Sequence, residues 1–145
     1  MRKVFADSSI LIAGAASRTG ASRAVLTMAE IGLFQLVISE QVLLECERNL
    51  SKKLPDALPI FSQLIAAINP DILPNPTAEE SNRWIGIIEA KDAPILAAAV
   101  LAKVDRLLSL NTKDFTVEVG IESGLIIQTP AEFMKEIREI VQRGL

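Results

Sequence analysis

The chain has 145 residues, of which 50% are hydrophobic and 23% are charged, and its formal net charge is −3. This length and composition predict one globular domain, residues 1–145, and exclude a disordered chain. The sequence contains no histidine and no tyrosine, which excludes Ser-His-Asp or Cys-His catalytic sites and zinc sites built on histidine. The negative charge argues against a globally basic nucleic-acid binder but leaves a local basic patch open.

The first residues begin like a secretion signal, because two basic residues precede an apolar stretch. The segment Asp7-Ser8-Ser9 interrupts that stretch, so no export signal is expected. No uninterrupted apolar run approaches the 18 residues of a membrane span. The single cysteine, Cys46, has no partner for an internal disulfide, which fits a cytoplasmic protein.

In chain order, the N-terminal half is predicted to form a strand at 3–6, helices at 10–16 and 23–31, a strand at 34–39, and helices at 40–50 and 60–68. Gly32 stops the second helix, and Ser39 caps the third. The third helix carries one apolar stripe, formed by Val42, Leu43, Cys46 and Leu50. Cys46 is therefore expected to be a core residue.

The C-terminal half begins with a brief strand in 69–76 and a helix that starts with the capping box of Thr77 and Glu80 and carries Trp84, Ile85 and Ile88. Next come a nearly all-apolar helix at 90–105, strands at 106–110 and 124–129, and an amphipathic helix at 130–144 that Gly144 ends. Strands alternating with helices predict a parallel sheet covered on both faces.

Four acids occupy positions where a ligand site can form. Asp7 follows the first strand, and Asp114 follows the strand at 106–110, as does Asn111; ligands bind beyond the carboxyl ends of parallel strands. Asp92 opens an apolar helix whose start is drawn toward the sheet. Asp105 precedes its strand and is excluded, because it belongs to the opposite end of the sheet.

The fourth acid, Glu45, lies roughly 100° around its helix from the centre of the apolar stripe, and Asn49 follows one turn later. Each acid also has a purely structural explanation: Asp7 and Asp92 as helix caps, Glu45 as a solvated side chain and Asp114 as a turn residue. If the acids converge within about 4 Å, they repel by about 4 kcal/mol per pair at an effective dielectric of 20, so a cation is required. An all-oxygen ligand set selects Mg²⁺ or Mn²⁺.

At these residues the chain resembles the PIN-domain family, which includes many ribonucleases and VapC-like toxins. The resemblance rests on FADSSILIAGAAS, LVISEQVLLECERNL, KDAPILAAAVLAKVDRLLSLNTKDF and TPAEF, of which the third segment is quite specific. It implies a three-layer α/β/α sandwich with a five-stranded parallel sheet of order 3-2-1-4-5. It also implies an Mg²⁺ or Mn²⁺ site built from Asp7, Glu45 and Asp92, with Ser8 or Ser9 supporting Asp7.

The sequence departs from the family pattern after the fourth strand. There the family has Thr or Ser, one residue, then an acid. In Ser109-Leu110-Asn111 an amide stands at the position of that acid, and Asp114, three residues later, is the nearest acid that could take its role. The resemblance implies that a metal-activated water, oriented by Asp92 or Asp7, hydrolyses RNA phosphodiester bonds, while Ser109 and Asn111 hold water or phosphate. Candidate phosphate contacts, by proximity in the sequence, are Arg18, Arg23, Lys91 and Lys113; ordinary surface charge is the alternative.

Two functions therefore stay open. The first is an Mg/Mn-dependent endoribonuclease, the toxin of a toxin-antitoxin pair, with RNA as substrate, a small antitoxin as partner and homodimers as the assembly. The second, favoured by Asn111, is a catalytically silent PIN-fold module that binds RNA or protein. A receiver-type phosphorylation domain is disfavoured, because the third strand does not end in aspartate and the fifth does not end in lysine.

Overall fold

The computed structural model describes residues 2–144. Its sheet has five parallel strands in the order β3-β2-β1-β4-β5, as expected. The strands are β1 (Lys3–Ala6), β2 (Gln35–Ser39), β3 (Asp71–Leu73), β4 (Arg106–Leu108) and β5 (Ile127–Gln128). The central strands are apolar and buried because helices cover both of their faces.

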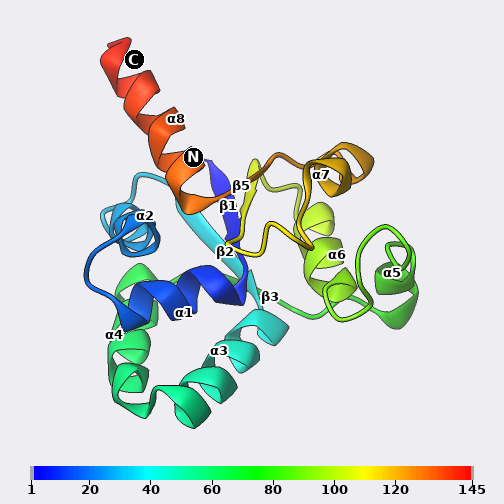
Figure 1. Cartoon of the computed structure of the whole chain (residues 1–145), viewed down its shortest axis with the longest axis horizontal. Coiled ribbons are helices and arrows are strands. Elements are labelled where there is room, and N and C mark those ends of the chain that lie inside the picture. Colours follow the sequence, from blue (N-terminus) through cyan, green and yellow to red (C-terminus); the bar gives the residue numbers. More distant parts are fainter. Residues whose placement is uncertain (1, 145) are drawn as a thin grey trace.

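The helices form the outer layers of the α/β/α sandwich. They are α1 (Ser8–Ala16), α2 (Ala21–Glu30), α3 (Glu40–Lys53), α4 (Leu58–Ile68), α5 (Ala78–Asn82), α6 (Ala93–Leu101), α7 (Val117–Ser123) and α8 (Pro130–Gln142), with a 3₁₀ turn η1 (Pro55–Ala57) before α4. Figure 1 shows α1 to α4 on one side of the sheet, α5 to α7 on the other, and α8 extending outward from the body. Within residues 2–144, no helix combines the length and the apolar character needed to cross a bilayer.

Local capping signals are realised where the sequence predicts them. The Ser39 hydroxyl accepts a hydrogen bond from the backbone N–H of Val42, and complete capping boxes open α5 at Thr77 and α8 at Thr129. Phe133 anchors α8, because it is fully buried and meets the ring of Phe34 edge-on at 5.4 Å between centroids. The caps fix where these helices begin, and Phe133 holds α8 against the core.

One predicted helix is wrong in its extent, and one helix was missed. The helix expected to run from Thr77 through Ile88 ends at Asn82, and the chain then turns, with Gly86 at a φ of +98°. Trp84 and Ile88 are nevertheless buried, so their apolar pattern reflects core contacts and not helical periodicity. Conversely, α7 was not predicted, because its apolar residues form no buried stripe: Val117 and Ile121 are both 75% exposed.

Candidate active site

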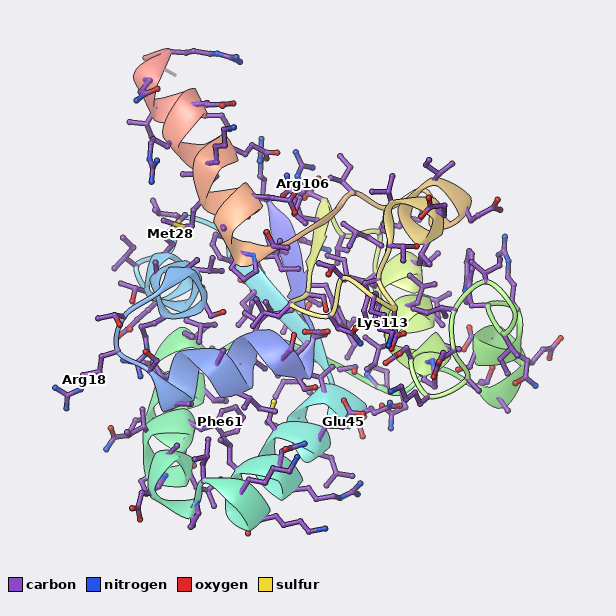
Figure 2. The ribbon with its side chains drawn as sticks, viewed as in Figure 1. Arg18, Met28, Glu45, Phe61, Arg106 and Lys113 are labelled. Carbon is purple, nitrogen blue, oxygen red and sulfur yellow. The ribbon has the colours of Figure 1, made fainter. Side chains whose placement is uncertain are left out.

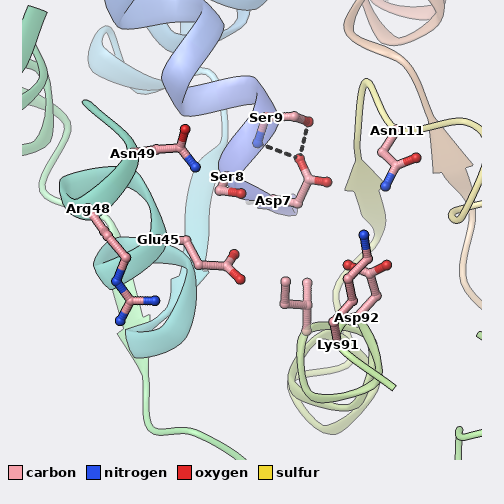
Figure 3. A pocket seen from close by; sticks show the side chains of 10 residues that line it. Asp7, Ser8, Ser9, Glu45, Arg48, Asn49, Lys91, Asp92 and Asn111 are labelled. Atoms are coloured by element: carbon pink, nitrogen blue, oxygen red, sulfur yellow. Dashed lines mark hydrogen bonds between the residues drawn. The ribbon is translucent and has the colours of Figure 1, made fainter. Parts of the chain in front are cut away.

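A pocket of about 320 Å³ lies beyond the carboxyl end of β1. Three of the four candidate acids, Asp7, Glu45 and Asp92, line it together (Figure 3). They come from the end of β1, from α3 and from the residue before α6, three segments that are far apart in the sequence. Ser8, Ser9, Asn49, Lys91 and Asn111, also expected at the site, line the same pocket.

Asp7 is held rigidly at the end of β1. It is only 4% exposed. Its Oδ1 accepts hydrogen bonds from the backbone N–H and the hydroxyl of Ser9, at 3.1 and 2.5 Å, and its Oδ2 accepts one from the hydroxyl of Ser109 at 2.5 Å. Burial raises the pKa of Asp7, against the opposing effect of these hydrogen bonds. Asp7 thus caps α1 and also faces the pocket, and Ser109, itself buried, acts by holding Asp7.

Asp92 is the least satisfied acid of the pocket. It occupies the N-cap position of α6, yet within residues 2–144 its side chain makes no capping hydrogen bond. Its Oδ2 is buried and has no hydrogen-bond partner in the described part of the chain. Burial, together with the neighbouring Asp114 carboxylate, raises the pKa of Asp92 to about 7. A buried carboxylate oxygen without a partner is unfavourable, and binding of a proton or a cation removes this cost.

Glu45 reaches into the pocket from α3. The side chain is half-buried, and Figure 3 shows its carboxylate pointing into the space between Asp7 and Asp92. Gln41, one turn earlier, donates from Nε2 to Glu45 Oε2 and also lies within hydrogen-bond distance of the Lys91 carbonyl, both at 3.4 Å. Sequence reasoning missed Gln41, although its spacing of four residues from Glu45 is the usual signal for a helical pair.

The donor set suits a hard divalent cation. The pocket offers carboxylate, hydroxyl and amide oxygens, and Oδ2 of Asp92 is buried without a partner. In this conformation, however, no three acidic or cysteine side chains among residues 2–144 lie close enough together to hold one ion. Ligation by all three acids therefore requires a side-chain movement, and Glu45 has the longest side chain of the three.

Asp114 lies beside the pocket and does not line it. Its Oδ2 accepts a hydrogen bond from Nδ2 of Asn111 at 2.9 Å, and its backbone N–H donates to Oδ1 of Asn111 at 3.2 Å. The hydrogen bond from Asn111 is the main reason that the pKa of Asp114 is lowered. Asp114 thus orients the amide of Asn111, which stands at the family's fourth acidic position. Asp114 does not occupy that position itself.

The candidate phosphate contacts separate into two groups. Lys91 lines the pocket and faces Oδ2 of Asp114 at 3.9 Å, and Lys113 lines a neighbouring groove. Arg18 and Arg23 lie beyond the far end of α1, about 13 Å along a nine-residue helix from its start at the pocket.

Arg18 and Arg23, candidate phosphate contacts by their closeness to Asp7 in the sequence, do not line the pocket, because α1 carries the chain away from it. Figure 2 shows Arg18 extending outward at the edge of the molecule, far from Glu45, and Nε of Arg23 donates to the Gly14 carbonyl. The pocket instead contains Arg48, which the sequence reasoning did not consider. Its spacing of three residues from Glu45 was an available signal.

Comparisons with known proteins agree with this fold. The matching family model is described as PIN domain and covers residues 3–113, more than half of the chain. A chain of VapBC2 from Rickettsia felis, crystallised with a DNA fragment from its promoter, is similar with a TM-score of 0.62 and 15% identity, over 88% of this chain and 98% of that chain.

PAE2754 from Pyrobaculum aerophilum is similar with a TM-score of 0.59 and 17% identity, over 87% of this chain and 89% of that chain. No curated protein matches the sequence significantly. At these identities the two structures support only the fold, whereas the family match is a match of the sequence. The chain belongs to the PIN-domain family.

Proposed function

We propose that this protein is a metal-dependent endoribonuclease that hydrolyses RNA phosphodiester bonds and acts as the toxin of a toxin-antitoxin pair. The observation that carries the proposal is the convergence of Asp7, Glu45 and Asp92 on one pocket in which Oδ2 of Asp92 is buried without a partner. Membership of the PIN-domain family, which includes many ribonucleases, supports the same conclusion.

Asp7, Glu45 and Asp92 would hold Mg²⁺ or Mn²⁺, which supplies charge neutralisation at the phosphate oxygens and makes a water molecule more acidic. Both oxygens of Asp7 already accept hydrogen bonds, so Asp7 is a fixed ligand. Oδ2 of Asp92 has no hydrogen-bond partner but is buried, so it would orient the attacking water and accept its proton once the side chain turns toward the pocket. Asn111, oriented by Asp114, presents its amide to water or phosphate without adding negative charge.

A catalytically silent PIN-fold module that binds RNA or protein is the second candidate. Two observations favour it: the amide of Asn111 stands where the family has an acid, and the three acids are not within ligation distance of one ion. The proposed partner in the toxin role is a small antitoxin, by analogy with the VapBC2 complex whose chain shares this fold, and the proposed assembly is a homodimer.

Incubation of the purified protein with structured and unstructured RNA, with Mn²⁺ and with a chelator, separates the two candidates. The nuclease proposal expects cleavage that needs Mn²⁺ and that Asp92→Asn abolishes. The matched control is Asp105→Asn, since Asp105 lies at the opposite end of the sheet, where it accepts a hydrogen bond from the backbone N–H of Lys3. Absence of cleavage, with a melting temperature that Mn²⁺ does not change, favours the silent module.

A further inference from the structure

Arg48 is an exposed cation at the rim of the acid pocket. It lies on α3, three residues after Glu45, and its side chain lines the pocket. Figure 3 shows the two side chains leaving α3 in different directions: Glu45 points toward Asp7 and Asp92, and Arg48 runs along the outer side of the helix. Arg48 is therefore placed beside the acids and not between them.

The charge of Arg48 is not offset by an ion pair within residues 2–144. Glu45 would be its natural partner at a spacing of three residues on a helix, but Glu45 accepts a hydrogen bond from Gln41 and points into the pocket. Lys91, on the opposite wall, faces Asp114 at 3.9 Å, which reduces the charge that it can offer to a ligand. Arg48 is thus the less compensated of these two cations.

We propose that Arg48 binds the phosphate that flanks the scissile one on the α3 side, so that an RNA strand crosses the mouth of the pocket between Arg48 and Lys91. This inference rests on the proposed ribonuclease function. Three carboxylates repel a polyanionic strand, so cations at the two walls are needed to hold the phosphates on either side of the reacting one. A guanidinium suits this role because it binds phosphate through two parallel N–H groups.

Binding of a labelled single-stranded RNA dodecamer, measured by fluorescence anisotropy at several KCl concentrations, tests the proposal. Ca²⁺ replaces Mn²⁺, and a gel confirms that the RNA stays intact. Arg48→Gln is expected to weaken binding about tenfold at low salt and to reduce the slope of log K against log salt by about 0.7, the value for one phosphate contact on a single strand. Arg48→Lys is expected to keep the slope.

Lys52→Gln is the matched control, because Lys52 is an exposed cation one turn further along α3 and outside the pocket. It is expected to leave the slope unchanged, and thermal melting checks that all variants are folded. In cleavage assays with Mn²⁺, Arg48→Gln should raise KM by a factor similar to its loss of affinity while kcat stays within about twofold.

Equal losses in Arg48→Gln and Lys52→Gln overturn the inference, since general charge on α3 would then explain them. An unchanged slope in Arg48→Gln, in a protein that does cleave RNA, overturns the inference and leaves the proposed function standing. A protein that neither cleaves nor binds RNA overturns both.

Discussion

Replacement of Asp92 by asparagine is expected to stabilise the metal-free protein at alkaline pH. The pKa of Asp92 is raised from 3.8 to about 7, mainly by burial and then by the carboxylate of Asp114. Between these two values the folded state binds more protons than the unfolded state, so the free energy of unfolding falls as the pH rises. The ionised Asp92 is therefore a source of instability at pH 8 that a neutral amide of the same shape removes.

The magnitude follows from the size of the pKa rise. The difference between a pKa of 3.8 and a pKa of about 7 corresponds to a ceiling of about 4 kcal/mol. Because the pocket is open to water and Lys91 lies nearby, screening is expected to leave about 1–2 kcal/mol. The stability advantage of Asp92→Asn should therefore grow from near zero at about pH 4 to its full value at about pH 8.

Urea denaturation of both proteins in EDTA at pH 4, 6 and 8 measures this difference. The control is Glu118→Gln, which removes an exposed acid on α7 and should show no such pH dependence. Added Mn²⁺ should stabilise the unaltered protein at pH 8 more than it stabilises Asp92→Asn, because a bound ion stabilises the state that binds it. An advantage that is the same at pH 4 and pH 8 would refute the assignment of Asp92 as a strained, buried acid.

Three further substitutions test the structure around the site. Ser109→Ala removes the hydroxyl that donates to Asp7 and should cost about 1–3 kcal/mol at pH 7 in urea denaturation; an unchanged unfolding midpoint would contradict this contact. Phe133→Ala empties a fully buried site and should cost about 3–5 kcal/mol, whereas a loss below 1 kcal/mol would mean that α8 is not anchored there. Gly14→Ala places a methyl group against Leu26, between α1 and α2, and should lower the free energy of unfolding by about 1–3 kcal/mol; calorimetry that shows a stabilised protein would contradict that packing.

Local features of the sequence predicted a parallel sheet covered by helices and several of its helix starts, whereas the strand order and the shared site were implied by the resemblance to the PIN-domain family. Helix starts at Ser39, Thr77 and Thr129 follow from side chains that accept a hydrogen bond from the backbone N–H three residues later. The position of Asp7 directly after a buried strand was enough to assign it to the ligand-binding edge of the sheet. These predictions depend on near neighbours in the sequence, which the sequence displays directly.

Local patterns misled where contacts between distant segments decide the position of a residue. The apolar pattern around Trp84 and Ile88 indicated a helix, but their burial comes from packing in a turn. Arg18 and Arg23 are close to Asp7 in the sequence, but α1 separates them in space.

The chemical state of the pocket was decided by tertiary structure alone. Orientation, burial and the partners of a side chain arise from residues brought together by the whole chain, as when Gln41 directs Glu45 and Asp114 orients Asn111. The unpartnered oxygen of Asp92 is the clearest example. A helix N-cap normally satisfies its own carboxylate locally, and only the folded arrangement leaves this one without a partner.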